Sequence, residues 1–159
     1  MKYSEAKLGR IFVLRLEHGD KIPDVIEEFA AKQKIKAAIV HFLGGADDGS
    51  KVVVGPEDGT ASKPRPMVTE LSGTSEAVGM GTLFINEAGI PKLHLHAAFG
   101  RKRETVTGCT REGVVVWHIG EAVICELLGI SAVRRVDLGT GFELLELDFK
   151  QKAAEQQRR

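Results

Sequence analysis

The chain has 159 residues, of which 43% are hydrophobic and 28% are charged. This length suits one compact domain with a full core and is short for two. Lys plus Arg and Asp plus Glu each number 22, so no excess positive charge attracts a polyanion over long range. The longest stretches without charge, such as 37–46 and 77–86, fall far below the ~20 apolar residues of a membrane-spanning helix.

The N-terminal residues and the cysteines both indicate a cytoplasmic protein. Lys2, Glu5 and Lys7 place charge where a secretory signal has its apolar core. Cys109 and Cys125 form no Cys-x-x-Cys pair, and a reducing compartment disfavours a disulfide between them. We therefore expect free thiols and no membrane association.

Residues 10–17 open the predicted fold as a strand rich in branched and aromatic side chains. A helix is expected next, because apolar residues recur at helical spacing: Ile22, Val25, Ile26, Phe29 and Ala30. Asp20 is expected to cap this helix, with Pro23 in its first turn.

Beyond the helix, nearly every segment has the pattern of a strand. The expected strands are 36–43, 50–54, 66–71, 77–85, 92–99, 103–107, 113–119, 121–128, 132–137 and 142–148. So many strands with one main helix predict an α+β domain, in which the helix packs on a large, mixed, mostly antiparallel sheet that curls toward a barrel. The polar residues 149–159 lack an apolar stripe and are expected to form a frayed or disordered tail.

The strand predicted over 92–99 carries the clearest functional signal. Side chains alternate along a strand, so His94 and His96 share one face while Leu93 and Leu95 share the other. Residues two apart in a strand lie roughly 6.5–7 Å apart at Cα, from where both imidazoles can reach one ion. The pair therefore predicts a divalent metal site, with zinc the best match. The alternative is a pair of hydrogen-bonded histidines in a core or interface.

The third ligand stays open from the sequence. His118 ends a predicted strand that could pair next to 92–99, and Cys109 follows a glycine in a turn. Each also has a plainer interpretation, since Cys109 can be a small buried residue and His118 a solvent-facing one. His41 could approach from another strand, although a core histidine is the plainer interpretation.

Charged residues near these positions suggest a ligand-binding rim. Glu121 could orient a metal-bound histidine or accept a proton, or simply form a salt bridge. Arg101, Arg103 and Arg111 could hold the carboxylate or phosphate of a small anionic ligand, or belong to solvated hairpins. With a metal to polarise a carbonyl or activate water, this set would suit an enzyme.

Five segments together resemble the PPC domain, which is shared by plants and prokaryotes: the first strand with its helix, 70–73, 93–97, 108–110 and 121–127. The resemblance covers about residues 8–148. It implies a homotrimer around a mixed sheet and, as in some prokaryotic members, a metal held through histidines. Plant members accompany AT-hook motifs in DNA-binding proteins, and stand-alone prokaryotic members are named as DNA-binding proteins by that analogy.

Two departures from the family pattern limit what the resemblance implies. The chain has no Arg-Gly-Arg-Pro core of an AT-hook, and its nearest match, Lys63-Pro64-Arg65-Pro66, is better explained as a stiff surface turn than as a minor-groove arm. Members with a full metal set often carry a Gly-His pair where this chain has Cys109 and Thr110, so only His94 and His96 carry over. The architecture also resembles zinc-dependent acetolactate decarboxylases, which makes a lyase-like activity on a small anion the alternative function.

Overall fold

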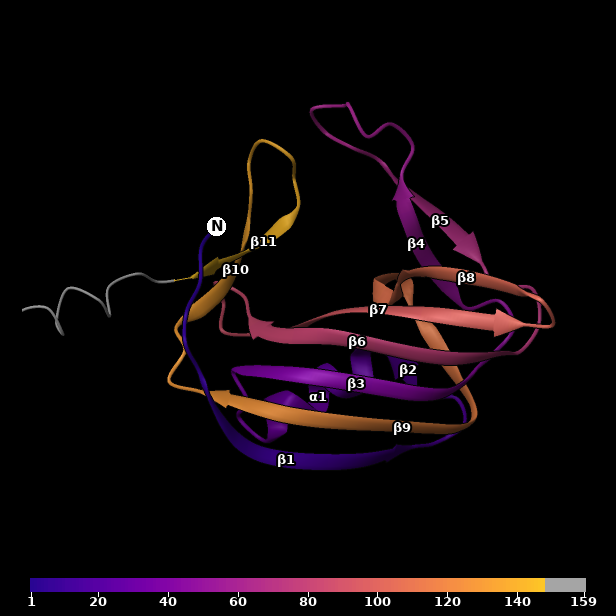
Figure 1. Ribbon diagram of the computed structural model, residues 1–159, viewed down its shortest axis with the longest axis horizontal. Helices are drawn as coiled ribbons and strands as arrows, with labels where there is room; N and C mark the ends of the chain where they lie inside the picture. The colour runs from indigo at the N-terminus through magenta and orange to yellow at the C-terminus, as the bar shows by residue number, and fades with distance from the viewer. Residues whose placement is uncertain (148–159) are drawn as a thin grey trace, which may run out of the picture.

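A computed structural model describes residues 1–147 (Figure 1). Its elements are, in chain order, β1 (Lys7–Leu16), β2 (Lys21–Ile22), α1 (Asp24–Lys32), β3 (Ala37–Ala46), β4 (Lys51–Pro56), β5 (Pro66–Glu70), β6 (Ser75–Ile85), β7 (Pro91–Arg101), β8 (Glu104–Cys109), the 3-10 turn η1 (Thr110–Glu112), β9 (Val114–Leu128), β10 (Ala132–Val136) and β11 (Glu143–Leu147). The tail expected at 149–159 lies outside the described residues.

Nine of the strands form one curled sheet, as the sequence predicts for an α+β domain. The hydrogen-bonded order is β1-β9-β3-β6-β7-β8-β4-β5, with β2 beside β9. Neighbouring strands of this sheet pair antiparallel. The sheet curls without closing, because β1 and β5 are not paired with each other. Strands β10 and β11 form a separate hairpin.

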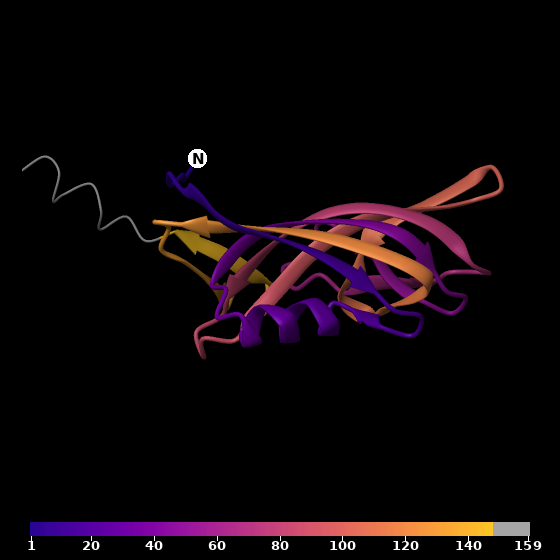
Figure 2. The same cartoon turned by 90° about the horizontal axis from the view of Figure 1, so that it is seen from below.

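The helix α1 covers one face of the sheet (Figure 2). Ile26 and Ala30 are buried on it, and the ring of Phe29 packs edge-on against Phe12 of β1, with centroids 5.3 Å apart. The core between helix and sheet includes Leu93 and Leu95 of β7. Within residues 1–147, no helix is long and apolar enough to cross a membrane.

The start of the helix differs from the sequence prediction. The helix begins at Asp24, and Pro23 holds the cap position without a side-chain cap. Asp20 does not cap it, because its carboxylate accepts a hydrogen bond from the amide of Glu17 at 2.8 Å. Ile22 belongs to β2, although its side chain is buried in the same core.

Two strands expected at 113–119 and 121–128 are a single strand, β9, with an irregularity in its middle. Opposite β9, Gly44 pairs with Gly120 while the next residue, Gly45, pairs with Trp117, so two residues of β9 bulge out between them. His118 lies in this bulge with φ at 55°. Gly120, which separates the two expected strands, therefore marks a bulge within one strand and not a strand end.

Candidate metal centre

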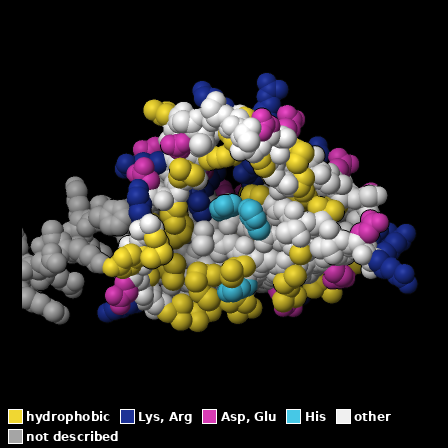
Figure 3. Space-filling model, turned by 45° about the horizontal axis from the view of Figure 1, so that its top comes forward, with side chains coloured by type: hydrophobic (Ala, Val, Ile, Leu, Met, Phe, Trp, Pro, Cys, Tyr) yellow, Lys and Arg dark blue, Asp and Glu magenta, His cyan; other side chains and the backbone are white. Residues whose placement is uncertain are grey.

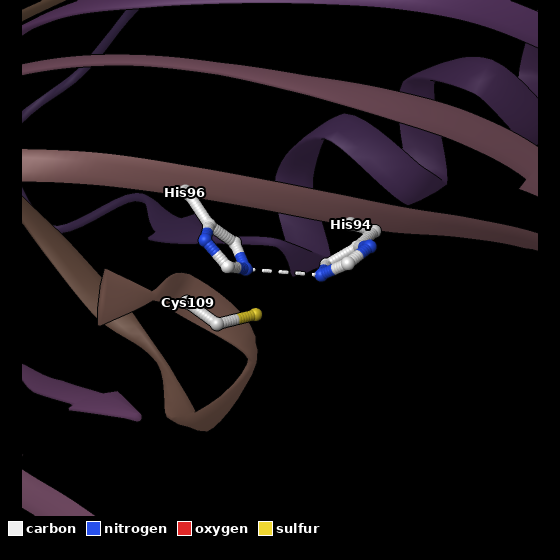
Figure 4. A group of neighbouring side chains, drawn as sticks. All are labelled: His94, His96 and Cys109. Atoms are coloured by element: carbon white, nitrogen blue, oxygen red, sulfur yellow. Dashed lines mark hydrogen bonds between the residues drawn. The ribbon is translucent and has the colours of Figure 1, made fainter. Parts of the chain in front are cut away.

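His94 and His96 lie side by side on β7, on the sheet face turned away from α1, which we call the outer face. The burial of β7 alternates as predicted, with Leu93 and Leu95 buried and both histidines exposed. The Nε2 atoms of the two rings are 3.0 Å apart, within hydrogen-bond distance, and the ring planes are inclined by 75° (Figure 4). Each ring has the other as its partner, since within residues 1–147 no hydrogen bond joins either ring to a backbone carbonyl.

This spacing fits two ligands of one ion. Two imidazole nitrogens bound to one tetrahedral zinc at about 2.0–2.1 Å each would lie about 3.4 Å apart. The observed 3.0 Å needs only a small opening of the rings. In the metal-free pair, one Nε2 must carry a proton and the other must accept it, so a cation would take the place of that shared proton.

Cys109 completes a group of three metal-ligating side chains. It is the last residue of β8 and not part of a turn, and it lies directly opposite His96 in the β7–β8 ladder. The thiol points toward the two rings (Figure 4), and the ligand atoms of His94, His96 and Cys109 all lie within 4.8 Å of one another. Two imidazoles and a thiolate are a zinc-type ligand set, and three protein ligands leave a fourth position open.

The backbone under these ligands is fixed by a buried hydroxyl. Thr110, the first residue of η1, donates a hydrogen bond from Oγ1 to the carbonyl of Leu95 at 3.3 Å. Leu95 is the residue between the two histidines, and Thr110 directly follows Cys109. The bond therefore ties the segment that carries the thiol to the segment that carries the imidazoles.

The surroundings of His94 favour its neutral form. Partial burial lowers the pKa of His94 below its ordinary value, although part of the ring stays exposed. The positive charges of Arg134 and Arg111 and the neighbouring His96 lower the pKa further. A neutral imidazole has a free nitrogen lone pair, which is the form that binds metals.

Arg134 was not among the residues that the sequence singled out. It lies on β10 and is only 5% exposed. Its Nη2 donates to the carbonyl and hydroxyl of Thr82 at 3.1 and 3.0 Å, and its Nε donates to the carbonyl of Lys92 at 3.4 Å. Because Thr82 is the cross-strand neighbour of His94, these bonds place the guanidinium beside the metal-ligand group.

The other expected ligands lie elsewhere. The pairing of β9 beside β7 was wrong, because β9 pairs with β1 and β3. His118 instead stacks on His18, with ring centroids 4.9 Å apart. Glu121 is exposed on β9 between Arg15 and Leu43, with β3 and β6 separating β9 from β7, and is not placed to orient either histidine. His41 is exposed on the outer face, and β6 separates its strand from β7.

Only one member of the expected arginine rim lies near the histidines. Arg111 on η1 is two residues from Cys109, and its charge acts on His94. Arg101 and Arg103 lie at the far end of the β7–β8 hairpin, where the guanidinium of Arg101 donates to the carbonyl of Thr74 at 2.6 Å. The three arginines are therefore not gathered at one place, and the positive charges that act on His94 belong to Arg111 and Arg134.

Comparison with known families identifies the class of protein. The model of the Plants and Prokaryotes Conserved (PCC) domain matches residues 3–128. The chain belongs to this family, which confirms the resemblance seen in its motifs. A comparison with curated proteins returned no match.

Solved structures with the same fold include three informative cases. A metal-containing protein from Archaeoglobus fulgidus is 26% identical, with a TM-score of 0.78, covering 92% of this chain and 99% of its own. A plant- and prokaryote-conserved protein from Pyrococcus horikoshii is 23% identical, with a TM-score of 0.77 and coverages of 94% and 100%. A protein named "Putative DNA-binding protein" from Ralstonia eutropha JMP134 is 20% identical, with a TM-score of 0.66 and coverages of 86% and 90%.

Proposed function

We propose that this PCC-domain protein binds one divalent metal ion, zinc, through His94, His96 and Cys109. The observation that carries the proposal is the convergence of two imidazole nitrogens and one thiol within 4.8 Å. The name of the Archaeoglobus fulgidus protein, which has the same fold, supports a metal in this family. When bound, zinc would supply a Lewis acid with one position open to a water or ligand oxygen.

The ligand set favours zinc over harder cations. Mg²⁺ and Ca²⁺ take oxygen ligands, whereas thiolate and imidazole select zinc and other borderline or soft metals. The site lies at the end of β8 against β7, and regular strands hold ligands more rigidly than loops do.

Metal analysis of the purified protein tests this proposal. After loading with zinc and removal of unbound ion, we expect one zinc per chain, which a strong chelator removes. A protein that retains no zinc under these conditions contradicts the proposal. Cobalt provides a second test, because its visible spectrum reports tetrahedral coordination and shows a thiolate-to-metal band only if Cys109 is a ligand.

We further propose that the chain assembles as a homotrimer through the part of the outer face formed by β1, β9, β3 and β6, which leaves the side of β7 and β8 with the ligand group open. This part of the face carries large exposed apolar side chains: Leu43 of β3 is 53% exposed and lies opposite Val78 of β6, which is 65% exposed, and Val13 of β1 is 77% exposed. In Figure 3, hydrophobic side chains gather next to the histidines. Contiguous exposed apolar surface of this kind marks an interaction site, and a second and third copy of the chain would cover it.

An aspartate at Val78 is expected to break this assembly. The substitution Val78→Asp would bury a charge in the proposed interface, while the exposed position leaves the fold of each chain intact. Native mass spectrometry should show trimers for the unaltered protein and monomers for the variant. Leu138→Asp, at a 90% exposed residue between β10 and β11, is the matched control and should stay trimeric. A trimeric Val78→Asp protein, or a monomeric unaltered protein, would argue against the outer face as the interface.

DNA binding is the second candidate function, and the name of the Ralstonia eutropha structure is the observation in its favour. The Arg-Pro segment Lys63–Pro66 is exposed in the β4–β5 connection, where Glu57 and Asp58 offset its positive charge. A titration with A·T-rich duplex at falling salt concentration decides this candidate, because phosphate contacts strengthen steeply as salt is removed. Absence of binding at low salt eliminates it.

A further inference from the structure

A buried guanidinium without a carboxylate partner lies next to the proposed metal centre. Arg134 is only 5% exposed, and within residues 1–147 no carboxylate oxygen lies within 4.0 Å of its guanidinium. Its hydrogen bonds run to the backbone and hydroxyl oxygens of Thr82 and Lys92, which are uncharged. The ring of Phe84, whose centroid lies 5.8 Å from the guanidinium carbon, is a further uncharged partner, so the guanidinium has no negative partner and can take an anion from outside the chain.

Part of the guanidinium remains free to receive that anion. Nε and Nη2 hold the carbonyls on the two neighbouring strands, whereas Nη1 makes no hydrogen bond to the residues that the structure describes. These bonds fix the position of Arg134 and leave the two N–H groups of Nη1 free to donate. A guanidinium held in this way can donate from Nη1 to a carboxylate oxygen, and its charge strengthens that hydrogen bond.

The charges around the three ligand side chains also favour the binding of an anion. A divalent ion held by two neutral imidazoles and one thiolate keeps one net positive charge, to which Arg134 and Arg111 each add another. Arg111 is exposed on η1 and, within the described part of the chain, also lacks an ion-pair partner. Glu143 and Glu27 act on Arg134 only from beyond ion-pair distance. The centre therefore has an excess of positive charge and an open coordination position.

The surface of the molecule is hollowed next to the two adjacent histidines. Figure 3 shows two adjacent histidine side chains at the edge of a hollow, with Lys or Arg side chains close by. A small molecule can approach from that side, because both histidines are exposed, while Leu93 and Leu95 close the opposite side of β7.

We propose that Arg134, assisted by Arg111, binds the carboxylate of a small organic acid whose other oxygen reaches the open position of the His94–His96–Cys109 centre. The inference rests on the proposed metal binding, and it adds the class of ligand and the residues that select it. Arg134 holds the carboxylate from the buried side, and Arg111 approaches from the exposed side. A neutral molecule of the same shape would offer Arg134 and Arg111 no negative charge and would bind more weakly.

Cobalt-loaded protein allows the ligand to be tested apart from the metal. Lactate is the probe, and lactamide is its neutral counterpart of nearly the same shape. We expect lactate to shift the visible cobalt bands and lactamide to leave them unchanged at the same concentration. Arg134→Gln should weaken lactate binding roughly tenfold to a hundredfold, the range for loss of a hydrogen-bonded charge, and Arg111→Gln should weaken it less.

Controls separate this inference from the proposed metal binding. Arg135→Gln changes the neighbouring, half-exposed arginine, which pairs with Glu87 and Glu146, and it should leave lactate binding unchanged. Arg111→Gln alters an exposed side chain and keeps the test valid even if the buried Arg134→Gln variant fails to fold. Bound cobalt with no lactate effect, or equal lactate binding by the native protein and both variants, overturns the inference alone. Absence of bound metal in the native protein overturns the proposed function and this inference together.

Discussion

Alanine in place of His94 or His96 is expected to lower zinc affinity by roughly a hundredfold or more, because each change leaves only two protein ligands where zinc takes at least three. The group contains only these two imidazoles and the thiol of Cys109, so no other side chain in it can replace a lost ring. Competition with a chromogenic chelator measures the affinity, and metal analysis gives the stoichiometry. Cys109→Ser should also weaken binding and should abolish the thiolate-to-cobalt band.

The fold should survive these substitutions. Both histidines are exposed on the outer face, whereas the adjacent Leu93 and Leu95 anchor β7 in the core. The unfolding temperature of the metal-free variants should therefore match that of the metal-free native protein. His41→Ala is the matched control, since His41 is an exposed histidine on the same face but outside the ligand group. Native-like zinc affinity in His94→Ala, or an equal loss in His41→Ala, would contradict the proposed site.

Zinc should also stabilise the native protein more than the variants that lack a histidine ligand. A ligand that binds only the folded state adds about 2.7 kcal/mol at a free concentration of 100 times its dissociation constant. This effect should appear as a rise in unfolding temperature with added zinc for the native protein and for His41→Ala. For His94→Ala and His96→Ala, whose affinity is at least a hundredfold lower, it should fall to about 0.4 kcal/mol or less at the same zinc concentration.

The paired histidines were predictable because their signal is local. A strand has a period of two, so His94 and His96 had to share a face once 92–99 was assigned as a strand. The alternation of exposed and buried residues along β7 confirms that assignment. The fold class was predictable for a related reason, since one amphipathic helix among many short strand patterns leaves few other architectures.

Which third side chain joins the two histidines was not predictable from local patterns, because it depends on which strands are neighbours. Cys109 lies opposite His96 only because β8 returns directly beside β7. The alternative, His118, required β9 beside β7, but β9 lies between β1 and β3. Arg134 was missed for the same reason, since its guanidinium reaches Thr82 across a sequence separation of 52 residues. The family pattern does not identify this third side chain either, because this chain has Cys109 and Thr110 where family members often carry a Gly-His pair.

Gly81→Ala is expected to destabilise the fold by about 1–3 kcal/mol, the usual cost of an overpacked interior. Gly81 lies on β6 directly opposite Leu95. A Cβ at this position would lie 2.6 Å from the Cα of Leu95 and still closer to the carbonyl oxygen of His94. Since both atoms belong to the backbone, no side-chain rotation relieves the contact, and β7 must shift. Urea denaturation of the metal-free protein measures the loss.

The same substitution tests whether the position of β7 sets the metal geometry. The displaced segment is the one that carries His94 and His96, so zinc affinity should fall together with stability. Gly59→Ala is the control, because a Cβ there meets no atom within 4 Å, and it should change neither quantity. Native stability in Gly81→Ala would mean that β6 and β7 separate without cost. Lost stability with native zinc affinity would instead show that the histidine side chains can rotate to recover the site, and that the strand does not impose the ligand spacing.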